Sequence, residues 1–467
     1  MLSRAKEKCH GYKEKDHGYV DMLPLPMRFF RNNFTLFHAT GNEQREVVCQ
    51  GRERGGDSKN HFWNSCQTGI CCYLVTLPLV LLGIFVGKTM LWRLETNQDR
   101  PRIPLASHSV LQTLSLWDGQ WHLMNADVGY SYSPRTMSSV AFFPGYPILV
   151  GIVQRTTGLS FQLSGLIVSQ FFLIASFVLL HHYICLTRKG LSQASQIAFY
   201  AVFALAVFPT SFWLRMTYSE PLFLFLCLLS VYGMERKWPF WIIALIAGAA
   251  TGTRLVGAAL FFVLAWHVRK NSQSARQTLI RCAWLLPLSL WGILGYMTYL
   301  WLAFDAPLAF SQTQVHWYHR MPGPLWHRLQ CAITFEPVRA IFSFSSSAYW
   351  QRYDPRLPLL FSSHAMNAVI FVVAVVTGVF AIFKRWMTPK EIILAFFLLG
   401  IPYLSVGYTQ YMMSHGRFAL MVFPFFIAVG YILSRLPEYA ALPILTILAV
   451  YLGYMSCILA SGGYYIL

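Results

Sequence analysis

The sequence predicts an all-helical protein that crosses a membrane many times. Of its 467 residues, 55% are hydrophobic and only 12% are charged, whereas an ordinary soluble domain has roughly 25% charged residues. From Cys71 onward, apolar stretches close to the roughly 20-residue length of a spanning helix follow one another along the chain. The Lys and Arg residues behind the net charge of +18 lie in short clusters between these stretches, which indicates membrane topology rather than nucleic-acid binding.

The apolar stretches predict about eleven spanning helices. They cover residues 71–92, 162–186, 195–214, 217–234, 238–253, 255–268, 280–303, 363–384, 391–410, 417–434 and 438–460. The stretch from Phe142 to Val153 is apolar too, but it is short and contains Pro144 and Pro147. We expect it to lie at the membrane interface or to re-enter the membrane.

Residues 1–70 differ from the rest of the chain. They mix charged residues, Gly and His without a hydrophobic period, and they lack the apolar core of a signal peptide. We expect a flexible cytoplasmic extension, with the alternative that it is upstream sequence read from an incorrect start codon. Residues 71–467 would form the integral membrane domain.

Basic clusters predict the orientation of the spans. They fall at alternate ends of successive spans, at Arg188-Lys189, Arg236-Lys237, Arg269-Lys270, Lys384-Arg385 and Arg435. Positive residues mark the cytoplasmic side. The opposite side then receives the 93–161 loop, the 304–362 loop and the turns around Ser219, Arg254 and His415. Basic residues after the first span conflict with this scheme, namely Lys88, Arg93, Arg100 and Arg102.

Metal and nucleotide motifs are weak in this sequence. The ten cysteines show no metal-type spacing, and no Asp-x-Asp pair is present to hold a metal against a nucleotide diphosphate. Gly83-x-x-x-Gly87-Lys88-Thr89 resembles a phosphate-binding loop, but it is one residue short and lies inside a predicted span. We therefore predict neither a metal nor a cofactor.

The 93–161 loop contains a concentrated group of polar and aromatic residues. If residues 117–125 form a helix, Asp118, His122 and Asn125 share one face, and Trp117 and Trp121 lie beside them. A carboxylate, an imidazole and an amide next to two indoles form a surface suited to a sugar. The alternative is an amphipathic interfacial helix without chemistry.

Ionisable residues also fall at or beyond the predicted outer ends of spans, where a functional role is the first hypothesis. Glu220 and Asp305 are the acidic examples, with the alternatives that Glu220 begins a helix and Asp305 begins a turn. Arg254 and Arg417 are the basic ones. The aromatic-rich loop 314–324 either closes over a substrate or is an ordinary interfacial loop.

The motifs together resemble a known family, the PIG-V mannosyltransferases and their bacterial relatives. The matching segments follow one another in order: Trp117-Asp118-Gly119-Gln120-Trp121 with Gly129-Tyr130, Ala141 to Pro147, Thr217 to Phe223, Thr253 to Gly257, Asp305 to Phe310 with Gln314 and Trp317, and Gly416-Arg417-Phe418 before Phe423-Pro424. The sequence departs from the family pattern at Ala306, where relatives often carry Gly-Asp-Pro, and in its basic N-terminal extension.

The resemblance implies a GT-C fold, a multi-spanning helical bundle whose first external loop carries the active site. It also implies an inverting transfer of mannose from a polyprenyl- or dolichyl-phosphate carrier to a lipid or glycan acceptor. Such an enzyme acts at the endoplasmic reticulum lumen in eukaryotes or the periplasm in bacteria. The alternatives are a GT-C enzyme with another lipid-linked sugar or a protein acceptor, and a transporter or lipid flippase, although no internal repeat favours the last.

Within this resemblance, Asp118 is the expected general base, since the attacking hydroxyl must lose a proton. The guanidinium groups of Arg254 and Arg417 are expected to bind the lipid phosphate, because they bind phosphate bidentately and stay charged. The remaining candidates are expected to bind substrate; they are Trp117, Trp121, His122, Asn125, Glu220, Asp305, Gln314 and Trp317.

Overall fold

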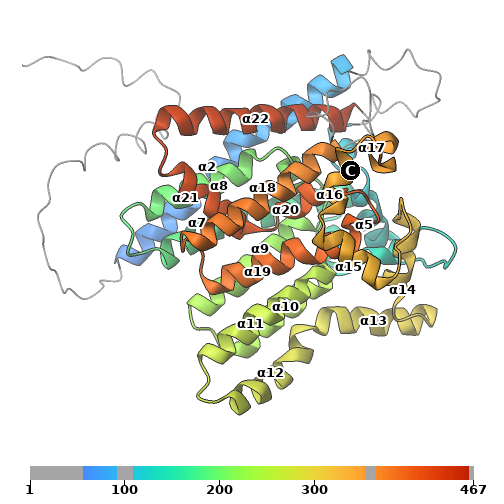
Figure 1. Cartoon of the computed structure of the whole chain (residues 1–467), viewed down its shortest axis with the longest axis horizontal. Coiled ribbons are helices and arrows are strands. Elements are labelled where there is room, and N and C mark those ends of the chain that lie inside the picture. The colour runs from blue at the N-terminus through green and yellow to red at the C-terminus, as the bar shows by residue number, and fades with distance from the viewer. Residues whose placement is uncertain (1–55, 92–108, 353–362, 462–467) are drawn as a thin grey trace, which may run out of the picture. The chain divides into compact units, whose positions relative to one another are not determined.

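The computed structural model describes residues 56–91, 109–352 and 363–461, and every element in these ranges is a helix (Figure 1). The prediction of an all-α fold is confirmed. The α-helices up to residue 270 are α2 (Gly56–Val86), α4 (Val110–Thr113), α5 (Asp118–Asp127), α6 (Gly145–Thr157), α7 (Phe161–Thr187), α8 (Ala194–Val207), α9 (Glu220–Glu235), α10 (Phe240–Thr253) and α11 (Ala259–Lys270). Those that follow are α12 (Ala275–Ser289), α13 (Trp291–Phe304), α14 (Ala309–Gln312), α15 (Leu325–Ile333), α16 (Glu336–Ile341), α17 (Ser347–Arg352), α18 (Ser363–Phe383), α19 (Pro389–Pro402), α20 (His415–Ala419), α21 (Phe423–Leu433) and α22 (Glu438–Ala460).

Short tighter or wider helical turns join several of these helices. The 3₁₀ segments are η4 (Ser139–Ala141), η5 (Ser211–Arg215), η6 (Leu255–Ala258) and η7 (Thr313–Trp317), and the π segments are η2 (Gly87–Leu91) and η9 (Tyr403–Gly407).

Several helices can cross a bilayer by length and composition. In the described residues, five stretches qualify, namely His61–Met90, Phe161–Thr187, Ala365–Phe383, Pro389–Gly407 and Glu438–Ala460. The pair α12 and α13, bent by 49°, adds a sixth if it is one span. Each predicted span contains helix, but α8, α10 and α21 are shorter apolar helices. The protein is an integral membrane protein, and the count of about eleven spans stays a prediction.

The first span begins earlier than the sequence predicted. Helix α2 starts at Gly56, so residues 56–70, which we assigned to the extension, are helical. A helix needs no unbroken apolar run to continue, because each added residue contributes a backbone hydrogen bond. The rest of the predicted extension lies outside the described residues.

Helix α2 packs against α7 and α22. Gly83 and Gly87 permit the contact with α22, because an added Cβ would lie 2.4 Å from the oxygen of Gly453 and 2.1 Å from that of Cys457. Small residues let spanning helices approach this closely. The glycines that imitate a phosphate-binding loop therefore serve helix packing.

The turns that the sequence placed on one side of the membrane come together. Residue contacts join the start of α5, the turn before α9, the end of α10 and helix α20. Figure 1 shows α5 and the short helices α14 to α17 toward one end of the longer helices. The predicted grouping is thus reproduced, while the side of the membrane stays a prediction.

One basic residue assigned to the other side is paired inside the protein. Arg188, after α7, forms a buried ion pair of 2.7 Å with Glu391 at the start of α19. Arg188 also donates a hydrogen bond of 3.1 Å to the carbonyl of Trp386. Part of the cationic charge at this end of the bundle is therefore neutralised inside the protein.

Candidate active site

Helix α5 forms as the sequence predicted and begins at Asp118. The indole-bearing residue before it, Trp117, is not on the helix: its backbone has φ 61°, a conformation that L residues rarely adopt. A carboxylate in the first helical turn suits the positive end of the helix dipole. Asp118 therefore sits at the helix start, where its side chain can face other elements.

The segment Thr217-Tyr218 holds the start of α5. The hydroxyl of Tyr218 accepts a hydrogen bond of 3.2 Å from the backbone N–H of Asp118 and donates one of 3.1 Å to the carbonyl of Leu116. Gly119 makes the close approach possible, because an added Cβ would lie 2.5 Å from the Thr217 hydroxyl oxygen. The motif that begins at Trp117 and the motif that begins at Thr217, about 100 residues apart in sequence, are therefore in direct contact.

Asp118, Arg417, Glu220 and Arg254 form a continuous series that we call the ion-pair chain. Arg417 Nη1 lies 2.6 Å from Asp118 Oδ2, and Arg417 Nε lies 3.1 Å from Glu220 Oε1. Arg254 Nη1 lies 2.8 Å from the same Glu220 oxygen. The two carboxylates and two guanidinium groups cancel in charge, which allows them to be partly removed from water.

Exposure varies along the ion-pair chain. The Glu220 side chain is 1% exposed and that of Arg417 is 9% exposed, whereas Arg254 and Asp118 are 19% and 27% exposed. The inner pair is therefore buried, and the two ends are open to solvent. A ligand can reach Asp118 and Arg254 directly, but it cannot reach Glu220 in this conformation.

Local backbone breaks place the members of the ion-pair chain. Glu220 begins α9 with Pro221 in the first turn, where proline costs no helical hydrogen bond. The expected alternative, that Glu220 starts a helix, is thus true and compatible with a site role. Arg254 has an extended backbone between α10 and η6, and it also donates to the Ser219 hydroxyl at 3.3 Å.

Aromatic rings enclose the inner arginine. The guanidinium carbon of Arg417 lies 5.4 to 5.6 Å from the ring centroids of Trp213, Tyr218 and Phe418. Burial by itself would lower the pKa of Arg417, but the carboxylates of Asp118 and Glu220 outweigh burial and raise it. Arg417 is therefore a permanent positive charge at the centre of the site.

His122 and Asn125 lie on the same face of α5, as predicted, but that face is buried. The His122 ring packs edge-on against Phe142 and Tyr146, with centroid distances of 5.3 and 5.1 Å. Burial lowers the pKa of His122 to about 4, against the opposing effect of Asp118 and Glu220, so the ring is neutral at neutral pH. The Asn125 amide donates to the carbonyl of Ser139 at 3.1 Å. Both residues support the loop that covers α5.

Phe142 connects two of the predicted substrate-binding indoles. The Trp121 ring is stacked on Phe142 at 5.8 Å, and the Trp317 ring meets Phe142 edge-on at 6.3 Å. Trp117 is partly buried against the main hydrophobic core instead. Trp121, on α5, and Trp317 thus form one aromatic surface through their shared contact with Phe142.

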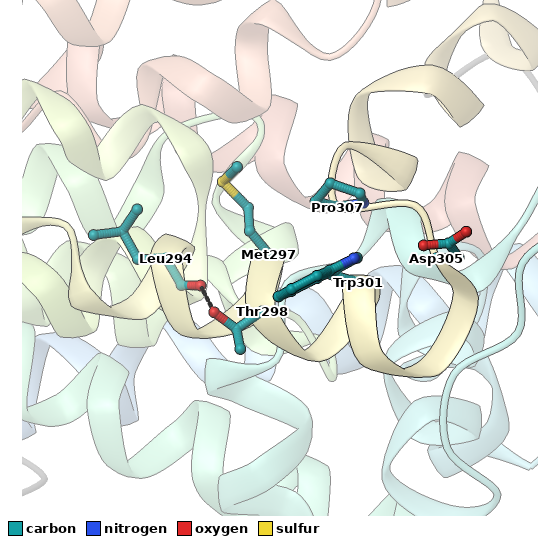
Figure 2. Close-up of a pocket in the computed structure, with 6 residues that line it drawn as sticks. All are labelled: Leu294, Met297, Thr298, Trp301, Asp305 and Pro307. Atoms are coloured by element: carbon teal, nitrogen blue, oxygen red, sulfur yellow. Dashed lines mark hydrogen bonds between the residues drawn. The ribbon is translucent and has the colours of Figure 1, made fainter.

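Asp305 and Gln314 lie apart from the ion-pair chain in the contacts of the described residues. Asp305 is exposed and ends α13 in a left-handed conformation with φ 53°. It lines a surface hollow of about 450 Å³, at the far end from Leu294 in Figure 2. The Gln314 amide donates to the carbonyl of Phe310 at 3.3 Å. In the described residues, no hydrogen bond or ion pair joins Asp305 or Gln314 to the ion-pair chain, and their substrate contacts stay a prediction.

Some site residues were missed by the sequence reasoning. Tyr218, Trp213 and Phe418 hold or enclose the charged groups, but they were not selected. The signal was present for Tyr218 and Phe418, because each lies within two positions of a selected ionisable residue in a recognised motif. No local pattern singles out Trp213.

Comparisons with known proteins match a large part of the chain. A family profile described as "Mannosyltransferase (PIG-V)" matches residues 101–352, which is more than half of the 467-residue chain. The matched range contains Asp118, Glu220 and Arg254 but ends before Arg417.

Named relatives align with part of the chain. The GPI alpha-1,6-mannosyltransferase 2 of Cricetulus griseus is 34% identical over 157 residues, which cover 32% of this chain and 30% of that protein. The Mus musculus protein of the same name is 33% identical over 165 residues, covering 33% and 32%. The alignments therefore span about a third of these relatives.

Among solved structures, the apo form of the Archaeoglobus fulgidus oligosaccharyltransferase is similar with a TM-score of 0.39 and 12% identity. The match covers 83% of this chain and 56% of that one.

Proposed function

Because the chain belongs to the mannosyltransferase (PIG-V) family, we propose that it transfers mannose from a polyprenyl- or dolichyl-phosphate carrier to a lipid or glycan acceptor, with inversion at the anomeric carbon. The observation that carries this proposal is the ion-pair chain, in which the partly exposed Asp118 carboxylate pairs with Arg417 and the buried Glu220 links Arg417 to Arg254. The matched relatives are GPI alpha-1,6-mannosyltransferases, so we favour a GPI-type glycolipid as the acceptor.

Asp118 is the proposed general base. The acceptor hydroxyl oxygen forms a bond to the anomeric carbon of mannose, and its proton passes to the Asp118 carboxylate. The bond between the anomeric carbon and the phosphate oxygen breaks at the same time, so the lipid phosphate leaves with the bonding electrons. The exposed fraction of Asp118, 27% of its side chain, gives the acceptor access to this group.

Arg254 and Arg417 are proposed to hold the departing phosphate. Negative charge accumulates on the phosphate oxygens as the bond breaks, and guanidinium groups held in place by a buried carboxylate stabilise that charge. Arg254 is the more exposed of the two, with 19% of its side chain open against 9% for Arg417. We therefore expect Arg254 to meet the donor first.

Glu220 has a different proposed role from the one expected from sequence. Its side chain is only 1% exposed and lies within ion-pair distance of both arginines. A group that a ligand cannot reach does not bind it directly. We propose that Glu220 positions Arg254 and Arg417, and that the aromatic surface of Trp121, Phe142 and Trp317 contacts the sugar or the acceptor.

The reaction is proposed to occur at the non-cytoplasmic face, in the endoplasmic reticulum lumen or in the periplasm according to the host. The support is that the ion-pair chain joins the 93–161 loop to the turns around Ser219, Arg254 and His415, which the basic clusters assign to this face.

Purified full-length protein in lipid nanodiscs tests the function. It is incubated with radiolabelled dolichyl-phosphate mannose and a GPI precursor that bears one mannose, and the lipid products are separated. We expect labelled acceptor, with an α-linkage after a β-linked donor. Transfer from GDP-mannose but not from the lipid donor would refute the donor assignment, and transfer only to a peptide would refute the acceptor assignment.

A further inference from the structure

The segment Tyr408 to Ser414 has an unusual backbone immediately before α20. Tyr411, Met412 and Ser414 have φ values of 50°, 60° and 64°, all in the left-handed region. L residues other than Gly rarely adopt this region, and they persist there only when the surroundings hold them. We call residues 408–414 the left-handed turn. Its end fixes where α20 begins, and α20 carries Arg417.

Buried side chains anchor the left-handed turn. Met412 is fully buried in a cluster with Val338 of α16 and Phe371 of α18, and Tyr411 is buried with Ala340 of α16. Two of the three residues with left-handed backbone, Tyr411 and Met412, thus have side chains that pack against α16. The conformation of the turn depends on α16 staying docked.

Arg320 forms hydrogen bonds to both α16 and the left-handed turn. Its Nη1 and Nη2 donate to both carboxylate oxygens of Glu336, the first residue of α16, at 2.9 and 2.7 Å. Its Nε donates to the carbonyl of Tyr408. The guanidinium carbon lies 3.5 Å from the Tyr408 ring centroid and 4.9 Å from that of Tyr411. One guanidinium group therefore binds both partners, with all three of its nitrogens engaged.

The backbone beside Arg320 makes the same connection. The N–H groups of His319 and Arg320 both donate to the carbonyl of Thr409, at 2.8 and 3.1 Å. The 314–324 loop thus docks on the left-handed turn through main chain and side chain together. None of these contacts reaches the ion-pair chain itself.

We infer that Arg320 is a positioning residue for Arg417: it clamps α16 and the 314–324 loop onto the left-handed turn, which sets the start of α20 and so the pairing of Arg417 with Asp118. The planar fork is required, because a Lys ammonium cannot bind a carboxylate bidentately, donate to a carbonyl and lie flat on a ring at once. The importance of Arg417 for turnover rests on the proposed function, whereas the mechanical link does not.

Hydrogen–deuterium exchange of the full-length protein in nanodiscs tests the mechanical link. Arg320→Lys keeps the positive charge. The matched control is Arg339→Lys, which changes an exposed arginine of α16 that lies about one helical turn after Glu336. We expect Arg320→Lys to speed exchange in residues 410–419 by about tenfold, through easier local opening, with α22 unchanged. Arg339→Lys should match wild type. Unchanged exchange in 410–419 in Arg320→Lys, or an increase spread equally over the whole chain, would overturn the inference.

A double-mutant cycle on mannosyl transfer provides a second test. It measures whether the effects of two substitutions on kcat/KM are coupled, which a purely structural role of Arg320 would not produce. If Arg320 acts through Arg417, the kcat/KM loss of the Arg320→Lys/Arg417→Lys double variant should be smaller than the product of the two single losses. The corresponding cycle with Arg339→Lys should be multiplicative. A multiplicative result for Arg320 would contradict the coupling. A protein that transfers no mannose would refute the proposed function, while the exchange experiment would still decide the link.

Discussion

Arg417 donates a 2.6 Å hydrogen bond to Asp118, joining two residues that are 299 positions apart. The proposed base and one proposed phosphate ligand are therefore hydrogen-bonded to each other in this structure. A donor phosphate that attracts Arg417 weakens this pair and frees Asp118 to accept a proton. Donor binding and base activation are linked in this account, and the donor should bind before the acceptor is activated.

The outer end of the ion-pair chain should govern donor affinity. Arg254→Lys keeps a positive charge but loses the guanidinium fork, so we expect KM for the lipid donor to rise by roughly tenfold with near-normal expression. Initial rates over a range of dolichyl-phosphate mannose concentrations measure this. Arg135→Lys, at an exposed position of the 93–161 loop, is the control. Unchanged donor affinity combined with aggregation would show that Arg254 serves the fold instead.

Glu220 should contribute strongly to stability. Its side chain is 1% exposed between two arginines, and Glu220→Gln leaves both positive charges without their shared partner. Removal of one member of a buried ion pair costs roughly 3 to 5 kcal/mol. The melting temperature in nanodiscs should fall clearly, whereas Glu438→Gln at an exposed position should leave it unchanged. Equal melting temperatures for both variants would contradict the buried pairing.

His122 should make stability depend on pH. Burial lowers its folded pKa from 6.5 to about 4, so between these values the unfolded chain binds a proton that the folded chain does not. Stability is therefore lost as pH falls through this window and is unaffected above pH 6.5. In His122→Gln, the fall in melting temperature from pH 7 to pH 5 should be smaller than in wild type. An identical fall would indicate that the pKa of His122 is the same in the folded and the unfolded chain.

The side of the membrane can be tested by thiol labelling in sealed vesicles. Ser131→Cys lies at an exposed position of the 93–161 loop, and Gln273→Cys lies in the turn between α11 and α12. We expect an impermeant reagent to label Cys at position 131 only from the non-cytoplasmic side and Cys at position 273 only from the cytoplasmic side. The reverse pattern would invert the topology and remove the donor assignment with it.

The sequence predicted the helical class, the helix at Asp118 and the grouping of the Ser219, Arg254 and His415 turns. Hydrophobic length and charge placement decide these features, and both are local in the sequence. The pairing of Glu220 with two arginines was not predictable in the same way, because it depends on how α9, α10 and α20 pack. Their helix ends could be placed, but not the side chains that meet there.

The predicted substrate role of Asp305 stays a prediction. It was selected because an ionisable residue at the end of a span is often functional. In the structure, Asp305 ends α13 with a left-handed backbone at φ 53°, and its exposed side chain lines a hollow whose lining residues include no member of the ion-pair chain. Trp117 has a similar explanation, since its φ of 61° takes it off the helix face on which it was expected. Positive φ at a residue other than Gly leaves little signal in one sequence.

Single-turnover transfer by Asp118→Asn tests the central claim most directly. Asparagine keeps the size and much of the hydrogen bonding of Asp118 but cannot accept the proton, so we predict a fall in the transfer rate of roughly a hundredfold or more with the donor still bound. Asp127→Asn, at the exposed C-terminal end of the same helix, should retain the wild-type rate. A near-wild-type rate in Asp118→Asn would contradict the assignment of Asp118 as the base.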